Sequence, residues 1–76
     1  MQNNDNIYDT VRKNIRKYRR LKCMTQQELA DAADLSHGYI REIESLNMRS
    51  TFSLDAVEKI ALALEIEAKK LFEEEL

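Results

Sequence analysis

Two helix-start signals that lie eleven residues apart, at Thr25 and Ser36, constrain the fold of this chain more than any other feature. Thr25 is followed three residues later by Glu28, and a pair with this spacing forms a reciprocal capping box at the first turn of a helix. Ser36 is a suitable cap for a second helix. Only two residues then remain between the helices, so the sequence predicts two short helices joined by a tight turn over residues 25–44.

The two short helices each have one apolar and one polar side. The apolar residues face one interior; they are Leu29, Ala33, Leu35, Ile40 and Ile43. The polar side of the second helix carries almost no bulk at its start and comprises Ser36, His37, Gly38, Arg41, Glu42 and Ser45. A helix with such a face, held by its neighbour across a turn of three or four residues, is typical of a helix-turn-helix, which lays its second helix in the major groove of DNA.

A wider set of residues has the joint spacing of one known family. The set comprises Ile15, Arg16, Arg19, Met24, Thr25, Gln26, Leu29, Ala30, Leu35, Ser36, Tyr39, Ile40, Ile43 and Glu44, and then Ser53, Leu54, Val57, Ile60, Ala61, Ala63, Leu64, Ile66, Leu71 and Phe72. Through this spacing, roughly residues 11–73 resemble the Cro/repressor-type (XRE-like) helix-turn-helix family. The resemblance implies an all-α, compact five-helix lambda-repressor-like DNA-binding domain with the helix-turn-helix at helices 2 and 3.

The sequence departs from the family pattern in the two connections that flank the second helix of the motif. Asp34 stands where the family usually has Gly, and Asp enters the left-handed backbone region more easily than most residues do. The loop after Glu44 contains neither Gly nor Pro, and it is longer than is usual in the family.

The segment before the motif predicts a first helix that runs to about Lys22 and is capped within residues 3–5. Because the resemblance begins only near Val11, two alternatives stay open: the helix is extended at its start, or residues 1–6 are loose. The inward stripe of this helix is Ile7, Val11, Ile15, Tyr18 and Leu21 or Lys22.

The segment after the motif predicts two further helices. Ser53 caps the fourth, whose inward stripe is Leu54, Val57, Ile60, Ala61 and Leu64. The fifth covers about residues 67–75, and its local signals are poor. Glu67 is a weak cap, and Lys69 and Lys70 oppose the positive end of the helix dipole, so packing must hold this helix.

Composition indicates a single helical domain over residues 1–76, with an acidic end at 73–76. The chain has one Gly, no Pro and no hairpin signal. Its first ten residues are polar, and no apolar run approaches 18 residues. We therefore expect no signal peptide, no membrane partner and a cytoplasmic location.

Charge is distributed unevenly along the chain, whose net charge is −2. Residues 1–24 hold seven Lys or Arg and two Asp or Glu, whereas residues 25–64 hold three and seven, and residues 65–76 hold two and five. A basic first helix beside the motif favours a DNA partner, since the local field matters more than the sum. The alternative is a merely solvated helix face, formed by Arg12, Lys13, Arg16, Lys17, Arg20 and Lys22.

The helix faces assign roles to single residues. We expect His37, Gly38, Arg41 and Glu42 to face the base edges, with Gly38 either permitting a close approach or removing one reader. Phosphate contacts are expected from helix starts, basic residues and the loop, namely from Arg16, Arg19, Gln26, Ser36, Tyr39, Asn47, Arg49, Ser50 and Thr51. In the resembled family, the arginine that matches Arg19 lies against the glutamate that matches Glu44, which implies a structural ion pair between the first helix and the end of the third.

A single short recognition helix touches too few bases to find its site in a genome, and a domain of this size gains stability by burying more surface. The sequence therefore favours a homodimer on an inverted-repeat operator, most simply as a repressor. The apolar residues with the least evident need in a monomer core are Leu62, Phe72 and Leu76, which makes them the expected dimer interface.

No chemistry other than binding is visible in the sequence. It contains no phosphate-cradling glycine loop and no paired nucleophile and base, so we expect neither an enzyme nor a cofactor nor a small-molecule ligand. Cys23 and His37 are the only residues of their types and do not form a metal-ligand pattern. The alternative function is a protein-interaction module, such as an antitoxin, that uses the acidic run at residues 73–75 and binds DNA secondarily.

Overall fold

The computed structural model describes residues 6–46 and 51–74, and all the regular structure in these ranges is helical. The α-helices are α1 (Ile7–Leu21), α2 (Gln26–Ala33), α3 (His37–Glu44) and α4 (Leu54–Leu64), and a 3-10 helix, η1 (Ala68–Phe72), follows them. The prediction of a fifth α-helix at residues 67–75 is wrong in this detail, because η1 is a short 3-10 turn. Glu67 makes no side-chain capping hydrogen bond, which agrees with the weak start signal in the sequence.

Side-chain caps start each of the four α-helices. The capping box of Thr25 and Glu28 is confirmed, since each side chain accepts the backbone N–H of the other residue. Ser36 and Ser53 cap α3 and α4 as predicted. The cap of α1 is Asn6, which forms a box with Asp9. The prediction that the cap lies within residues 3–5 is therefore wrong. Those residues lie outside the described ranges.

One core joins all the elements. Its buried members are Val11, Ile15, Leu29, Ala30, Ala33, Ile40, Ile43, Val57, Ile60, Ala61, Leu64 and Leu71. Three residues that the helical period placed on inward stripes are exposed instead: Ile7 (53%), Leu21 (68%) and Leu54 (74%). Each is the first or last residue of its helix.

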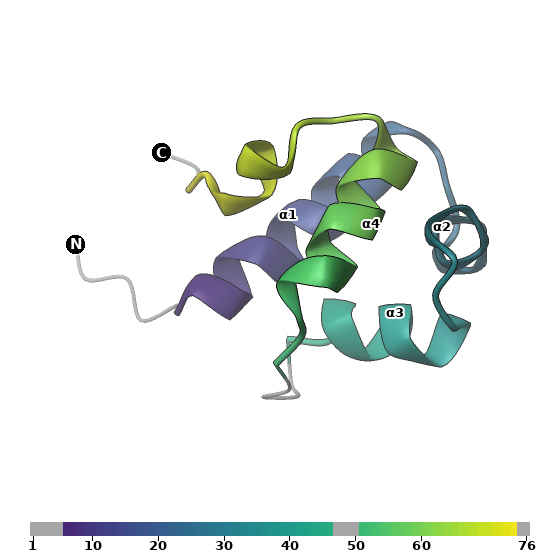
Figure 1. Cartoon of the computed structure of the whole chain (residues 1–76), viewed down its shortest axis with the longest axis horizontal. Coiled ribbons are helices and arrows are strands. Elements are labelled where there is room, and N and C mark those ends of the chain that lie inside the picture. Colours follow the sequence, from purple (N-terminus) through teal and green to yellow (C-terminus); the bar gives the residue numbers. More distant parts are fainter. Residues whose placement is uncertain (1–5, 47–50, 75–76) are drawn as a thin grey trace.

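Figure 1 shows how the elements surround α1 and α4: α3 runs along the lower edge, while η1 lies on the opposite side, above α1. α1 packs against α3, α4 and η1, and α2 packs against α3 and α4. The Asn14 side chain holds η1 on α1 by donating to the carbonyl oxygens of Leu71 at 2.8 Å and Glu73 at 2.7 Å. This arrangement leaves the outer side of α3 uncovered by the other helices.

Two features of other protein classes are absent from the described residues. None of their helices has the length and the apolar character that a membrane crossing requires. Within the same ranges, no three His, Cys, Asp or Glu side chains lie together as a group that could hold a metal ion.

Candidate nucleic-acid interface

The turn between α2 and α3 fixes how α3 is presented. Asp34 ends α2 in the left-handed conformation, with φ 58° and ψ 45°, as its tolerance of this region led us to expect. The backbone N–H of Leu35 then donates to Ala30 O at 2.9 Å, and Ser36 Oγ accepts from the backbone N–H of Tyr39 at 3.0 Å. The chain thus turns within a few residues, and α3 starts with its apolar side on the core.

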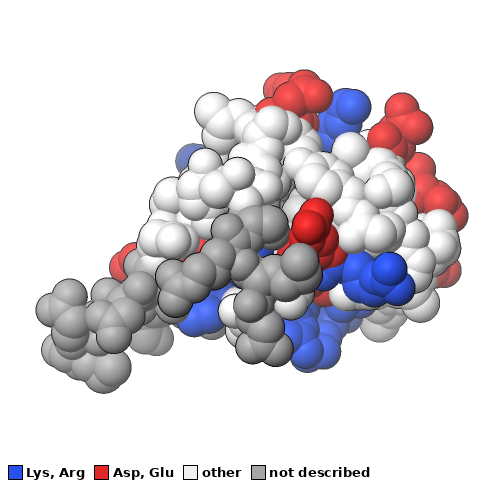
Figure 2. Space-filling model, turned by 90° about the horizontal axis from the view of Figure 1, so that it is seen from below, with Lys and Arg blue, Asp and Glu red and all other residues white. Residues whose placement is uncertain are grey.

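The outer side of α3 carries the residues expected to face base edges. Gly38 and Arg41 are exposed, and His37 and Glu42 are half-buried. A shallow hollow of about 440 Å³ on this side is lined by Gly38, Arg41, Glu42 and Ser45. Figure 2 looks onto this side of the molecule and shows basic side chains around an acidic group. The structure therefore brings Gly38, Arg41 and Glu42 together in one hollow on the outer side of α3, and His37 stands half-buried at the start of the helix.

Gly38 has no packing role within the described part of the molecule. A Cβ atom built at this position meets no heavy atom within 4 Å. Gly in a helix destabilises it by about 0.5–1 kcal/mol relative to Ala. Since the surrounding structure does not require a glycine here, any requirement for one must come from a molecule that approaches α3 from outside.

A buried ion pair fixes the end of α3 to α1. Arg19 Nε lies 2.7 Å from Glu44 Oε2, and Arg19 Nη2 lies 2.9 Å from Glu44 Oε1, so the guanidinium grips the carboxylate with two hydrogen bonds. Arg19 Nη1 donates to Met24 O at 2.7 Å, and Gln26 Nε2 adds a third donor to Glu44 Oε1 at 3.1 Å. The side chains of Arg19 and Glu44 are only 11% and 3% exposed. The pair thus positions α3 against α1 and leaves Arg19 little surface for a phosphate.

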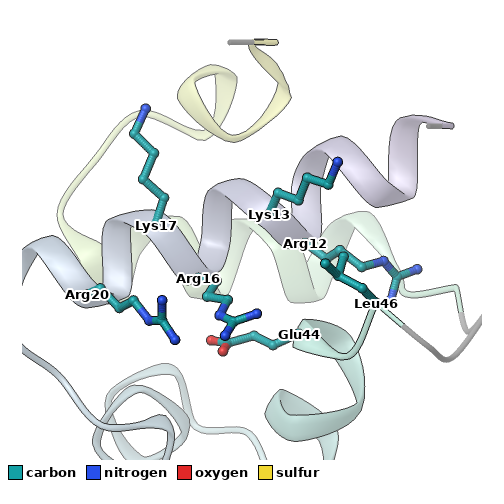
Figure 3. A pocket seen from close by; sticks show the side chains of 7 residues that line it. All are labelled: Arg12, Lys13, Arg16, Lys17, Arg20, Glu44 and Leu46. Carbon is teal, nitrogen blue, oxygen red and sulfur yellow. The ribbon is translucent and has the colours of Figure 1, made fainter. Parts of the chain in front are cut away.

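A basic groove runs beside this ion pair. It has a volume of about 360 Å³ and is lined by Arg12, Lys13, Arg16, Lys17, Arg20, Glu44 and Leu46. In Figure 3 the side chains of Arg16 and Arg20 lie on the Glu44 side of α1, whereas those of Lys13 and Lys17 point away from it. The basic surface expected on α1 therefore reaches the end of α3, but only Arg16 and Arg20 face that end.

The other expected contact residues are distributed as follows. Gln26 and Ser36 stand at the starts of α2 and α3, where the first backbone N–H groups have no partner within the helix. Tyr39 is half-buried on α3, and Thr51 is exposed ahead of α4. Asn47, Arg49 and Ser50 lie outside the described residues. Of the expected dimer residues, Leu62 is 73% exposed, Phe72 packs partly against the core, and Leu76 also lies outside the described residues.

Two polar residues of α1 have structural roles that sequence reasoning missed. Arg12, which the sequence grouped with the solvated basic residues, is only 2% exposed, and Asn14 is 5% exposed. A weak signal exists for both, because they flank the apolar positions Val11 and Ile15 on the helix. Their hydrogen-bond partners are backbone carbonyl oxygens 31 to 59 residues away, which no sequence pattern marks.

The carboxyl group of Glu65, just after α4, is perturbed by a basic neighbour. Lys22 at the end of α1 forms a hydrogen-bonded ion pair with Glu65 after α4. This hydrogen bond and the positive charge of Lys22 hold the pKa of the Glu65 side chain below its ordinary value. The pair joins two helix ends and does not involve α3.

Comparisons with known proteins agree with this geometry. The helix-turn-helix family model matches residues 15–71, which is most of the chain. Among curated proteins, none matches the sequence.

Several solved structures share the fold. The restriction-modification controller protein C.AhdI from Aeromonas hydrophila is 29% identical, with a TM-score of 0.77, and the match covers 86% of this chain and 96% of that chain. The hypothetical transcription factor NHTF from Neisseria is 27% identical, with a TM-score of 0.84 and coverages of 97% and 83%. The controller protein C.Esp1396I, bound to a 25 base pair operator site, is 29% identical, with a TM-score of 0.78 and coverages of 90% and 87%.

The match over residues 15–71, the motif at α2 and α3 and the likeness to these controllers lead to one conclusion. This chain belongs to the Cro/repressor-type (XRE-like) helix-turn-helix family and is a DNA-binding transcriptional regulator.

Proposed function

We propose that this protein is a repressor that binds an inverted-repeat operator in double-stranded DNA as a homodimer, with α3 in the major groove. The observation that carries the proposal is the outer face of α3, where Gly38, Arg41 and Glu42 line one hollow and Gly38 and Arg41 are exposed. This face has no large apolar side chain, which suits base edges better than a protein partner. A regulator of this kind acts in the cytoplasm, where it meets the DNA.

Within the proposed complex, Arg41 is the main reader. A guanidinium can donate two hydrogen bonds to O6 and N7 of a guanine, which is the commonest specific contact of arginine in the major groove. His37 and Glu42 flank it and reach neighbouring base pairs. Gly38 lets the backbone of α3 come close to the DNA, which agrees with the open space around this residue.

Phosphate contacts hold α3 in this position. The first turns of α2 and α3 start at Gln26 and His37, and in this proposal their free backbone N–H groups and the positive ends of the two helix dipoles bind phosphates. Arg16 adds a charge from the groove on α1, and Tyr39 adds a hydroxyl group from α3. Asn47 and Arg49 extend the contacts along the loop in this proposal.

The dimer forms through the part of the molecule that the DNA leaves free. Leu62 on α4 is 73% exposed, and an apolar side chain there is covered when two copies meet. Phe72 and Leu76 belong to the same proposed interface. A two-fold contact of this kind places the two α3 helices one DNA turn apart, about 34 Å, which requires an inverted-repeat site.

Selection of bound duplexes from random DNA tests this proposal. We expect enrichment of one sequence family that contains two inverted half-sites with centres about one helical turn, or 10 base pairs, apart. Enrichment of a lone, non-repeated half-site would contradict the dimer. The absence of any enriched sequence would contradict specific operator binding altogether.

A further inference from the structure

Arg12 is, together with Arg19, one of two buried arginines on α1, whose other basic residues reach solvent. Only 2% of it is exposed, although Lys13, Lys17 and Arg20 on the same helix are exposed. Its Nε atom lies 3.2 Å from Asp9 Oδ1 in the first turn of α1. Burying a guanidinium is costly unless its donors form hydrogen bonds, so the other contacts of Arg12 should explain why it is buried.

The first of these contacts lies at the C-terminal end of α3. The other three α-helices of the described ranges are followed by a residue in the left-handed conformation, namely Cys23, Asp34 and Glu65. α3 lacks such an ending, because its C-cap Ser45 is extended, with φ −78° and ψ 117°. Instead, Arg12 Nη1 donates to Ile43 O at 3.0 Å and to Ser45 O at 3.3 Å. A positive charge at these carbonyl oxygens also complements the negative end of the α3 dipole.

The second contact lies on the far side of the connection between α3 and α4. The Arg12 guanidinium carbon is 5.6 Å from the centre of the Phe52 ring, just before the cap of α4. Tyr8, one turn earlier on α1, packs edge-on against the same ring at 5.1 Å. One side chain therefore contacts the chain both before and after residues 47–50, and Figure 3 shows Arg12 beside Leu46 at the start of this connection.

We propose that Arg12 is a positioning residue for DNA recognition: it fixes the C-terminal end of α3 and both ends of the connection to α4, and thereby the base contact made by Arg41. The inference rests on the proposed function. Arg12 acts through α3 and does not itself touch DNA.

The test compares the affinity of the full-length protein for the duplex enriched by selection with its affinity for a scrambled duplex of equal length, below the melting temperature of every variant. Arg12→Met keeps the aliphatic stem and removes all donors, and Arg12→Lys is the second variant in case Arg12→Met does not fold. Asn14→Ala is the matched control, because Asn14 is also buried on α1 but donates to carbonyl oxygens of Leu71 and Glu73, away from α3.

We expect Arg12→Met to lower the ratio of the two affinities at least about tenfold, with the loss concentrated at the base position that Arg41→Ala affects and with an unchanged salt slope. Arg12→Lys should lower this ratio less, because its ammonium group can still donate a hydrogen bond to a carbonyl oxygen at the end of α3. Asn14→Ala should keep the ratio of the unmodified protein even though it melts at a lower temperature.

Two results would overturn the inference while leaving the proposed function intact. In the first, the Arg12 variant that folds discriminates between the two duplexes as well as the unmodified protein does. In the second, the affinities for both duplexes fall by the same factor and the salt slope falls by about one, which would make Arg12 a phosphate contact. If the unmodified protein itself does not discriminate, the proposed function fails, and the inference fails with it.

Discussion

Replacing Glu44 with alanine should destabilise this protein far more than the loss of an ordinary carboxylate. The Glu44 side chain is 3% exposed and accepts hydrogen bonds from Arg19 Nε, Arg19 Nη2 and Gln26 Nε2. Glu44→Ala leaves the Arg19 guanidinium buried, with only its bond to Met24 O. Removing one partner of a buried pair costs about 3–5 kcal/mol. We expect the lower end, about 3 kcal/mol, because 11% of the Arg19 side chain already reaches solvent.

For a domain of this size, each kcal/mol lowers the melting temperature by about 4–8 °C, so Glu44→Ala should lower it by roughly 12–24 °C. Circular dichroism melts measure this change, and Glu58→Ala, at an exposed position of α4, is the matched control. The double variant Arg19→Met/Glu44→Met should be more stable than Glu44→Met alone, since it leaves no unpaired charge. Equal melting temperatures for Glu44→Ala and Glu58→Ala would refute the reasoning.

Three further predictions follow from the geometry of single residues. Gly38→Ala should raise the unfolding free energy by about 0.5–1 kcal/mol but weaken binding to the selected duplex, and undiminished binding would show that the α3 backbone does not approach DNA closely. Leu62→Glu should convert a dimer into a folded monomer in sedimentation experiments at micromolar concentration, whereas a persistent dimer would place the interface elsewhere. Because the folded-state pKa of Glu65 is lowered by Lys22, the stabilisation from this pair is present above the ordinary glutamate pKa and is lost as the pH falls through the folded-state value. Urea midpoints of the unmodified protein and Glu65→Gln should therefore differ slightly at neutral pH and converge in acid, and divergence in acid would contradict this assignment.

The motif could be predicted from the sequence because its determinants are local. The Thr25 and Glu28 box, the Ser36 cap and the left-handed Asp34 each depend on residues within a few positions along the chain. The fifth helix was overestimated because packing of Leu71 holds a short turn there, while a local start signal is missing. Periodicity marks the inward side of a helix, but it does not show where the neighbouring helix stops.

The parts that could not be predicted depend on distant backbone atoms. The sequence placed Arg12 on a solvated helix face and gave Asn14 no role, because their partners are carbonyl oxygens of α3 and of the segment around η1, which are distant in the sequence. By contrast, the Arg19 and Glu44 pair was accessible through the family resemblance, and the structure forms it. The roles of the individual residues toward DNA stay predictions, since they depend on a partner molecule.

The central claim is that α3 reads bases through Arg41, and the most direct test is the affinity of Arg41→Ala for the selected and the scrambled duplex. We expect a loss of about 1–3 kcal/mol on the selected duplex at one base position, with little change on the scrambled one. Arg16→Ala, for comparison, should weaken both duplexes alike and lower the salt slope by about one. If Arg41→Ala lowers the affinity for the selected and the scrambled duplex equally, α3 does not dock in the major groove as proposed.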